Sequence, residues 1–233
     1  MIRPRCVLFD FWNTIVRSTM NHNGAIQAML DVAENPRNVS VADVQEAAME
    51  MKAAGKHIRE NVFFEFTRQQ FDLNVADRLG LIYRQPKEEL DRVFASGALD
   101  PKAEPGAAEV LSELHHLGIK MGVVSNSVMG ENAISEILEK LKLREYFDFV
   151  MTSADYGFRK PQLQLFKTAL ALAGELAEKT WFMGDWLTQD IAGAQKAGLF
   201  AVWYNMDGKD PGEFVPELTI SHWSELSIAV KTA

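Results

Sequence analysis

Several residues that can do chemistry lie at the ends of apolar runs in the sequence. Asp10 directly follows one run, with Thr14 four residues later, and Ser125 ends a second run. Asp185 follows a third run, and Asp190 lies five residues beyond it. A carboxylate at the end of a strand can act as a nucleophile or as a metal ligand, and a serine hydroxyl with nearby backbone amides can hold an anion. The pattern therefore suggests a site for an anionic substrate.

A fourth segment can supply positive charge. Two carboxylates at one strand end repel each other unless a cation neutralises them, and Lys160, which precedes Pro161, can do this. Mg²⁺ bound by one or two carboxylates and by substrate phosphate oxygens would serve the same purpose. Each motif alone also has a plainer interpretation. Asp10 can cap a turn, Ser125 with its neighbour can cap the helix that follows, and Asp190 can do the same for its own helix.

The elements that must position these residues alternate along the chain. Apolar runs separated by amphipathic stretches predict an α/β fold of three layers, in which helices cover both faces of a parallel sheet. The expected strands are Cys6–Phe11, Ile119–Ser125, Phe147–Thr152, Trp181–Gly184, Phe200–Tyr204 and Leu218–Ile220. The helices expected between them are Ala107–Leu117, Glu131–Leu141, Gln162–Ala173 and Thr188–Ala197.

The interval 17–97 has a different character. It is rich in Ala, Met, Glu, Lys, Gln and Arg and lacks a convincing strand. The expected helices are Gly24–Ala33, Val41–Ala54, Ile58–Leu73 and Pro86–Ala95. We therefore expect two domains: an α/β core formed by residues 1–16 and 98–233, and an all-helical domain inserted between them at residues 17–97.

Taken in chain order, the motifs resemble those of the haloacid dehalogenase superfamily. The matching segments are Asp10-x-x-x-Thr14, Ser125-Asn126, Lys160-Pro161 and Gly184-Asp185-x-x-x-x-Asp190. The resemblance covers the whole α/β part, and the inserted helices lie where the family carries its helical cap of the first type. It implies a Rossmann-like core, a hydrolase activity and a small-molecule substrate.

The resemblance also implies roles for individual residues. Asp10 would be the nucleophile, Thr14 and Ser125 would hydrogen-bond the transferring group with help from the backbone of Asn126, and Lys160 would neutralise charge. Mg²⁺ would be the cofactor. Its ligands would be Asp10, Asp185 and the backbone carbonyl of Trp12, while Asp190 would orient Lys160 or a metal-bound water.

Trp12 departs from the family pattern. Phosphatases of the superfamily usually have a second aspartate at this position, which protonates the leaving alcohol. Branches that cleave C–halogen or C–P bonds, the 2-haloacid dehalogenases and the phosphonoacetaldehyde hydrolases, also lack it. The dehalogenases have serine in place of Asp185, and the phosphonatases need a cap lysine, for which Lys52 and Lys56 are candidates. A non-catalytic binding protein is a further alternative.

We favour a Mg²⁺-dependent, phosphatase-type hydrolase that acts on a small phosphorylated metabolite through an aspartyl-phosphate on Asp10. Trp12 and Trp186 each adjoin a carboxylate, so we expect an aromatic wall that binds the substrate. Either indole can instead pack into the core.

The composition and charge of the chain exclude several classes of protein. The 233 residues carry a net charge of −8 and are 47% apolar, which is typical of a globular protein. No apolar run is long enough to span a membrane, and the acidic balance disfavours nucleic-acid binding. A single cysteine, Cys6, excludes an internal disulfide, and we expect a cytoplasmic protein without a signal peptide. The oligomeric state and the substrate stay open.

Overall fold

A six-stranded parallel sheet forms the centre of the molecule. The structure is a computed structural model and describes residues 2–233. The strand order is β5-β4-β1-β6-β7-β8, and each neighbouring pair is parallel. The strands are β1 (Cys6–Phe9), β4 (Lys120–Ser125), β5 (Phe149–Thr152), β6 (Thr180–Gly184), β7 (Phe200–Tyr204) and β8 (Leu218–Ile220).

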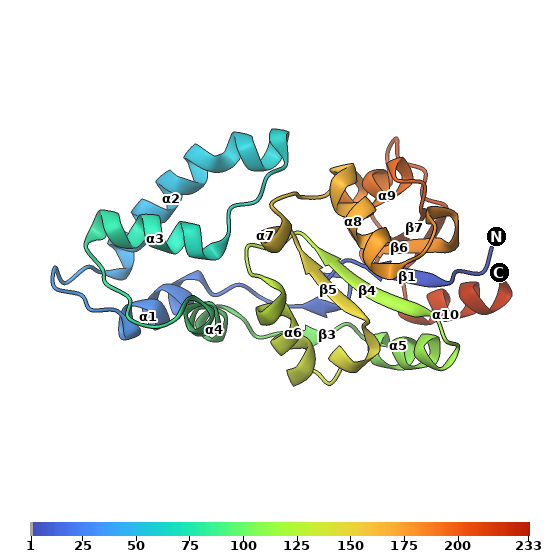
Figure 1. Cartoon of the computed structure of the whole chain (residues 1–233), viewed down its shortest axis with the longest axis horizontal. Coiled ribbons are helices and arrows are strands. Elements are labelled where there is room, and N and C mark those ends of the chain that lie inside the picture. The colour runs from blue at the N-terminus through green and yellow to red at the C-terminus, as the bar shows by residue number, and fades with distance from the viewer. Residues whose placement is uncertain (1) are drawn as a thin grey trace.

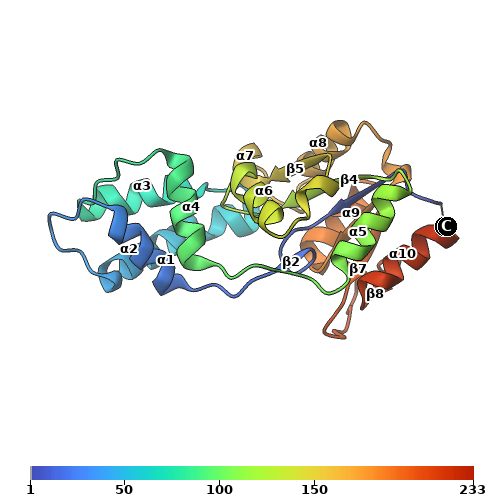
Figure 2. The same ribbon diagram turned by 90° about the horizontal axis from the view of Figure 1, so that it is seen from below.

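Helices cover both faces of this sheet because its strands are apolar on both sides. In β1, Val7 and Phe9 belong to one buried cluster, while Cys6 and Leu8 belong to the other. The first cluster packs under α5 (Ala107–His116), α6 (Glu131–Lys140) and α10 (Trp223–Thr232), and the second under α8 (Leu163–Ala173) and α9 (Ala192–Lys196). Figures 1 and 2 show these layers. The predicted fold class is confirmed.

The helical segment between β1 and β4 lies to one side of the sheet (Figure 1). We call its four helices the helical cap: α1 (His22–Val32), α2 (Val41–His57), α3 (Arg68–Leu79) and α4 (Lys87–Ala98). An antiparallel ribbon of β2 (Val16–Arg17) and β3 (Lys102–Ala103) joins the cap to the core. None of the helices within residues 2–233 combines the length and the apolar character needed to cross a bilayer.

The prediction of one continuous helix over Ile58–Leu73 is wrong. A π-helical turn at Ile58–Val62 extends α2 and ends where Phe63 has a left-handed φ of 58°. The chain then runs without helix to Thr67, which begins α3 because its side chain accepts from the Gln70 N–H while the Gln70 side chain accepts from the Thr67 N–H. We call residues 63–67 the docking segment, since they contact the core as described below.

The ribbon between cap and core is fixed by a buried carboxylate. Glu104, which follows β3, accepts hydrogen bonds from Nε and Nη2 of Arg17 at 2.8 and 2.9 Å. The hydroxyl of Tyr204 on β7 donates to the same carboxylate at 3.2 Å. Because Glu104 is buried, this paired arrangement offsets the cost of removing its charge from water. The ribbon is therefore tied to the sheet as well as to the cap.

Asp91 of α4 is a buried carboxyl group that lacks its own cation. Its exposed fraction is 9%, and among the described residues its Oδ1 has no hydrogen-bond partner. The neighbouring Arg68 instead donates from Nε to Asp72 at 2.8 Å. Burial, followed by repulsion from Asp72, raises the pKa of Asp91 to about 6. The ionised form of Asp91 is therefore unfavourable in the folded protein.

Replacing Asp91 with Asn is expected to stabilise the protein near neutral pH. The folded-state pKa of Asp91 exceeds the unfolded value, so its contribution to stability is full below pH ~4 and is lost as pH rises through ~6. Removing the charge should raise the free energy of unfolding by about 1–2 kcal/mol at pH 7.5 and by much less at pH 4.5. Urea unfolding at both pH values measures this difference.

The matched control is Asp77→Asn, which removes an exposed carboxylate from the neighbouring helix α3. It should change the free energy of unfolding by less than about 0.5 kcal/mol at either pH. An Asp91→Asn effect of equal size at both pH values would contradict the assigned cause.

Candidate active site

The carboxyl edge of the sheet brings a lysine and two carboxylates together in the interior. Lys160 is 1% exposed, and its Nζ lies 2.5 Å from Oδ1 of Asp10 and 2.7 Å from Oδ1 of Asp190. Its Nζ also donates to the carbonyl of Val124 at 2.9 Å, which ties it to β4. Asp10 directly follows β1, so the side chain of Lys160 spans the ends of two neighbouring strands.

Three carboxylates share this single ammonium group. Asp10, Asp185 and Asp190 each offer an oxygen, and these oxygens lie within 4.8 Å of one another. Burial raises the pKa of Asp10 to about 7; Asp190 and Asp185 add to this shift, while Lys160 opposes it. Burial and the charge of Asp190 likewise raise the pKa of Asp185 to about 6. Burial alone would lower the pKa of Lys160, but its pairs with Asp10 and Asp190 raise it.

This charge balance suits a divalent cation. One ammonium group cannot neutralise three neighbouring carboxylates, so an added cation would favour their ionised forms. Carboxylate oxygens are also the ligands that Mg²⁺ prefers in proteins. The carboxylates of Asp10 and Asp185, which the family resemblance assigns as ligands, therefore fit Mg²⁺, with the carboxylate of Asp190 close to both.

Two hydroxyl groups near the same strand ends lack a protein partner. Thr14 and Ser125 are fully buried, and neither hydroxyl oxygen has a hydrogen-bond partner within the described part of the chain. Ser125 ends β4, and Thr14 lies in the turn that closes when the N–H groups of Ile15 and Val16 donate to Phe11. Because an unpaired buried hydroxyl is costly, this pair suits a ligand with oxygen acceptors.

The turn around Asp190 differs from the expected helix Thr188–Ala197. Residues Leu187–Ile191 form a π-helical turn, and α9 begins only at Ala192. Asp190 accepts from the Trp186 N–H at 3.0 Å through Oδ2, so its side chain closes the turn and leaves Oδ1 beside Lys160. A Cβ on Gly184 would lie 2.5 Å from this carboxylate, which explains the glycine before Asp185. Asp190 is thus held from two sides.

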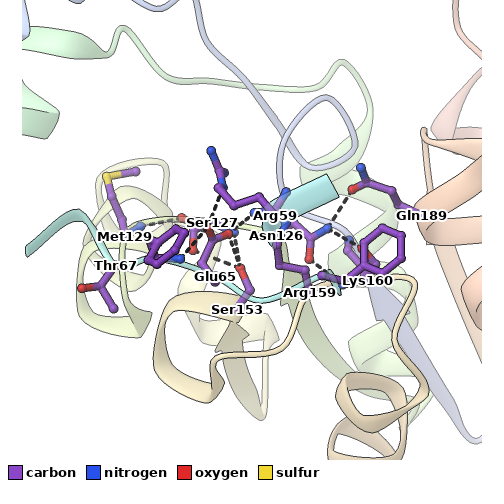
Figure 3. Close-up of polar contacts among 12 residues, drawn as sticks. Arg59, Glu65, Thr67, Asn126, Ser127, Met129, Ser153, Arg159, Lys160 and Gln189 are labelled. Atoms are coloured by element: carbon purple, nitrogen blue, oxygen red, sulfur yellow. Dashed lines mark hydrogen bonds and ion pairs between the residues drawn. The ribbon is translucent and has the colours of Figure 1, made fainter. Parts of the chain in front are cut away.

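Asn126 positions Lys160 through the main chain. Its Oδ1 accepts from the Lys160 N–H at 2.8 Å, and its Nδ2 donates to the Lys160 carbonyl at 3.0 Å and to Gln189 at 2.7 Å (Figure 3). The plainer alternative, in which Ser125 and Asn126 cap the following helix, is wrong, because α6 begins at Glu131, as predicted, and Gly130 is its N-cap. The Asn126 side chain therefore holds the main chain of Lys160, whereas the predicted contact with the transferring group concerns the Asn126 backbone.

The two candidate tryptophans lie in different surroundings. Trp12 is half-buried and packs edge-to-face on Phe11, with ring centroids 4.6 Å apart. Trp186 is 57% exposed and lines a cleft of about 640 Å³ between the cap and the core. Trp12 does not line that cleft. The structure therefore does not join the two indoles into one aromatic wall.

A polar network beside Lys160 was not anticipated from the sequence. In Figure 3, Glu65 of the docking segment lies between Arg59, Arg159 and Ser153. The carboxylate accepts from Arg59 Nε at 3.0 Å and from Ser153 Oγ at 2.9 Å, and it also pairs with Arg159. Backbone bonds join the Glu65 N–H to Gly157 and the Arg159 N–H to Phe63, each at 2.8 Å.

The missed residues left different traces in the sequence. Arg159 precedes the motif lysine and Gln189 precedes Asp190, so their positions marked them as neighbours of the site. Glu65 stands in the run Phe63-Phe64-Glu65-Phe66, whose aromatic enrichment is more typical of an extended segment than of a helix.

The fold and the site together define an enzyme with a Rossmann-like core and a buried Asp–Lys–Asp group at the carboxyl edge of its sheet. A sequence model of the haloacid dehalogenase-like hydrolases matches residues 4–198. The chain belongs to this family and is a hydrolase, which confirms the resemblance noted from the motifs.

Known proteins similar to this chain include a phosphatase and a dehalogenase. Glyceraldehyde 3-phosphate phosphatase of Methanocaldococcus jannaschii is 26% identical over 202 residues, which cover 84% of this chain and 82% of that protein. The solved 2-haloacid dehalogenase of Pseudomonas syringae pv. Tomato DC3000 has a TM-score of 0.70 and 24% identity, covering 100% of this chain and 99% of its own. The HAD-hydrolase YfnB of Bacillus subtilis, solved bound to magnesium, has a TM-score of 0.62 and 24% identity. The match covers 98% of this chain and 99% of that chain. These structural similarities show the shared fold.

Proposed function

We propose that this hydrolase is a Mg²⁺-dependent phosphatase that acts on a small phosphorylated metabolite through Asp10. The observation that carries the proposal is the buried group of three carboxylates and Lys160, with the unpartnered hydroxyls of Thr14 and Ser125 at neighbouring strand ends. The similarity to a protein named glyceraldehyde 3-phosphate phosphatase supports the same class of substrate.

The proposed reaction has two displacements at phosphorus. In the first, the Asp10 carboxylate forms a bond to phosphorus, and the bond to the leaving oxygen breaks with its electron pair. In the second, water attacks the same phosphorus, so that phosphate is released and the Asp10 carboxylate is restored. Thr14 and Ser125 donate hydrogen bonds to the phosphoryl oxygens, and Lys160 offsets the negative charge of Asp10 and the substrate.

Mg²⁺ would be held by the carboxylates of Asp10 and Asp185 and by the backbone carbonyl of Trp12. When bound, it would offset negative charge on the phosphoryl group. Asp190 pairs with the same ammonium group of Lys160 as Asp10 does and would orient it toward Asp10. The carboxyl group of Asp185 favours this chemistry over metal-independent C–halogen cleavage, because a third carboxylate beside Asp10 would otherwise disfavour the ionised nucleophile.

Trp12 restricts the leaving group. An indole cannot donate a proton to a departing alcohol, so the proposed enzyme works best when the leaving group is stable as an anion. Acyl phosphates meet this condition, since a carboxylate leaves without a proton.

A substrate panel with and without metal tests the proposal. We expect acetyl phosphate to be hydrolysed in Mg²⁺ and turnover to fall by at least about 100-fold in EDTA, because Lys160 alone cannot neutralise the carboxylates of Asp10, Asp185 and Asp190. Phosphate release is the readout. Halide release from 2-chloropropionate in EDTA would favour the dehalogenase alternative. A lack of turnover across all phosphate and haloacid probes, with Mg²⁺ binding retained, would favour a binding protein.

A further inference from the structure

The cleft beside Trp186 is lined by positive charge from both the cap and the core. Lys52 and Lys56 of α2 and Arg59 of the following turn face it from the cap, and Arg159 lines it from the core. The carboxylates near these four cations are those of Glu60, which also lines the cleft, and Glu65, which pairs with both arginines. The cleft thus has a surplus of positive charge in a chain whose net charge is −8.

The two arginines retain hydrogen-bond donors. Arg59 reaches Glu65 through Nε and Arg159 through Nη1, and the described structure assigns their side chains no other hydrogen bond. A guanidinium group carries five N–H donors in a planar fork, which suits a carboxylate or a phosphate. Burial, with repulsion from Arg59, lowers the pKa of Arg159 despite its pair with Glu65. An anion in the cleft would relieve this repulsion.

The cleft adjoins the candidate active site. Gln189 lines the cleft and accepts from Asn126, whose side chain holds the main chain of Lys160. Trp186 lines the cleft, directly follows Asp185 and donates its N–H to Asp190. Figure 3 shows Arg59, Arg159, Asn126 and Lys160 in one close-up, with the side chain of Asn126 bonded to the main chain of Lys160. Because Trp186 and Gln189 are the sequence neighbours of Asp185 and Asp190, the cleft lies next to the proposed catalytic carboxylates.

We propose that the cleft is a subsite for a second anionic group of the substrate, a carboxylate or a further phosphate. The inference rests on the proposed phosphatase function and narrows its substrates to phosphorylated metabolites that carry two anionic groups. Lys52, Lys56, Arg59 and Arg159 would bind the second anion, and the exposed indole of Trp186 would contact the carbon chain between the two groups.

Matched substrate pairs test the proposal. 3-Phosphoglycerate differs from glycerol 3-phosphate by a carboxylate, and ribose 1,5-bisphosphate differs from ribose 5-phosphate by a phosphate. We expect kcat/KM in Mg²⁺ to be at least about tenfold higher for one of the two probes with a second anionic group than for its partner, mainly through KM. The pair with the larger ratio identifies the second group as a carboxylate or a phosphate.

Variants then test whether the cleft residues cause the difference in kcat/KM within a substrate pair. In Lys52→Gln/Lys56→Gln, both replaced side chains are exposed, so the fold should be kept, and the ratio should fall about five- to tenfold. Arg59→Gln should lower it further. The matched control is Lys87→Gln, which removes an exposed cation from α4 away from the cleft and should leave the ratio unchanged. Equal ratios in the wild type and the double variant would overturn the subsite.

Binding measurements distinguish a failure of the subsite proposal from a failure of the phosphatase proposal. Absence of turnover with every phosphate probe, acetyl phosphate included, would refute the activity. Calorimetry in Mg²⁺ would still test the cleft. Tighter binding of a probe with a second anionic group than of its partner, lost in Lys52→Gln/Lys56→Gln, supports the subsite, whereas equal binding within both pairs refutes it.

Discussion

Asp10→Asn is expected to reduce Mg²⁺-dependent hydrolysis of acetyl phosphate by at least about 10⁴-fold without unfolding the protein. The amide keeps the size of the side chain but cannot form the bond to phosphorus. Lys160 keeps its partner Asp190, so the variant does not leave an unpaired buried cation. Steady-state phosphate release measures turnover, and thermal unfolding measures the integrity of the fold.

The same variant should bind Mg²⁺ more weakly, because one of the proposed carboxylate ligands becomes neutral. The rise in melting temperature that Mg²⁺ produces in the wild type should therefore be smaller in Asp10→Asn. Asp77→Asn, which removes an exposed carboxylate from α3, is the control and should retain both turnover and the Mg²⁺ response. Turnover within tenfold of the wild type in pure Asp10→Asn would exclude Asp10 as the nucleophile.

Trp12→Asp is expected to raise turnover of glycerol 3-phosphate by about 10²-fold, with a much smaller effect on acetyl phosphate. A carboxyl group at this position can protonate a departing alkoxide, and general acid catalysis of this kind is worth roughly 10²–10⁴-fold in rate. Trp12 is half-buried and contacts Phe11, so the variant loses some packing but leaves the buried strand β1 unchanged. Steady-state kinetics with both substrates give the comparison.

The Trp12→Asn variant distinguishes an effect of proton transfer from an effect of removing the indole. Its side chain matches Asp in size but cannot act as a general acid near neutral pH, so it should not accelerate alcohol release. Equal gains in the Asp and Asn variants would mean that removal of the indole, and not proton transfer, changes the rate. A folded Trp12→Asp variant with no gain for glycerol 3-phosphate would refute the account of Trp12 as the missing acid.

Much of the core could be predicted because its strands are buried on both faces. Such strands appear as short apolar runs, and β7 and β8 have the predicted bounds. The residues that meet around Lys160 could also be located, since each adjoins a strand end or follows a short motif. Their spacing could not reveal that Asn126 holds the main chain of Lys160, because that contact joins segments 34 residues apart.

The docking segment could not be predicted because its structure also depends on contacts with residues far away in the sequence. Apart from the aromatic run 63–66, residues 58–73 have a helix-forming composition, and pairing with Gly157 and Arg159 competes with helix formation within that run. Tertiary hydrogen bonds outweigh a modest local helix propensity in such a case.

The sequence pattern also does not predict the C-terminal helix α10. Its Trp223 stacks on Phe9 with ring centroids 5.4 Å apart, a contact between the two ends of the chain.

The docking segment limits how caps can be exchanged between members of this family. A chimera that replaces residues 17–97 would remove Glu65 and leave Arg159 and Ser153 without the carboxylate that they share. An engineered graft must therefore carry a compatible acidic residue, or the core must be redesigned along with it. The insertion is consequently not a freely transplantable module, although only a two-stranded ribbon connects it covalently to the core.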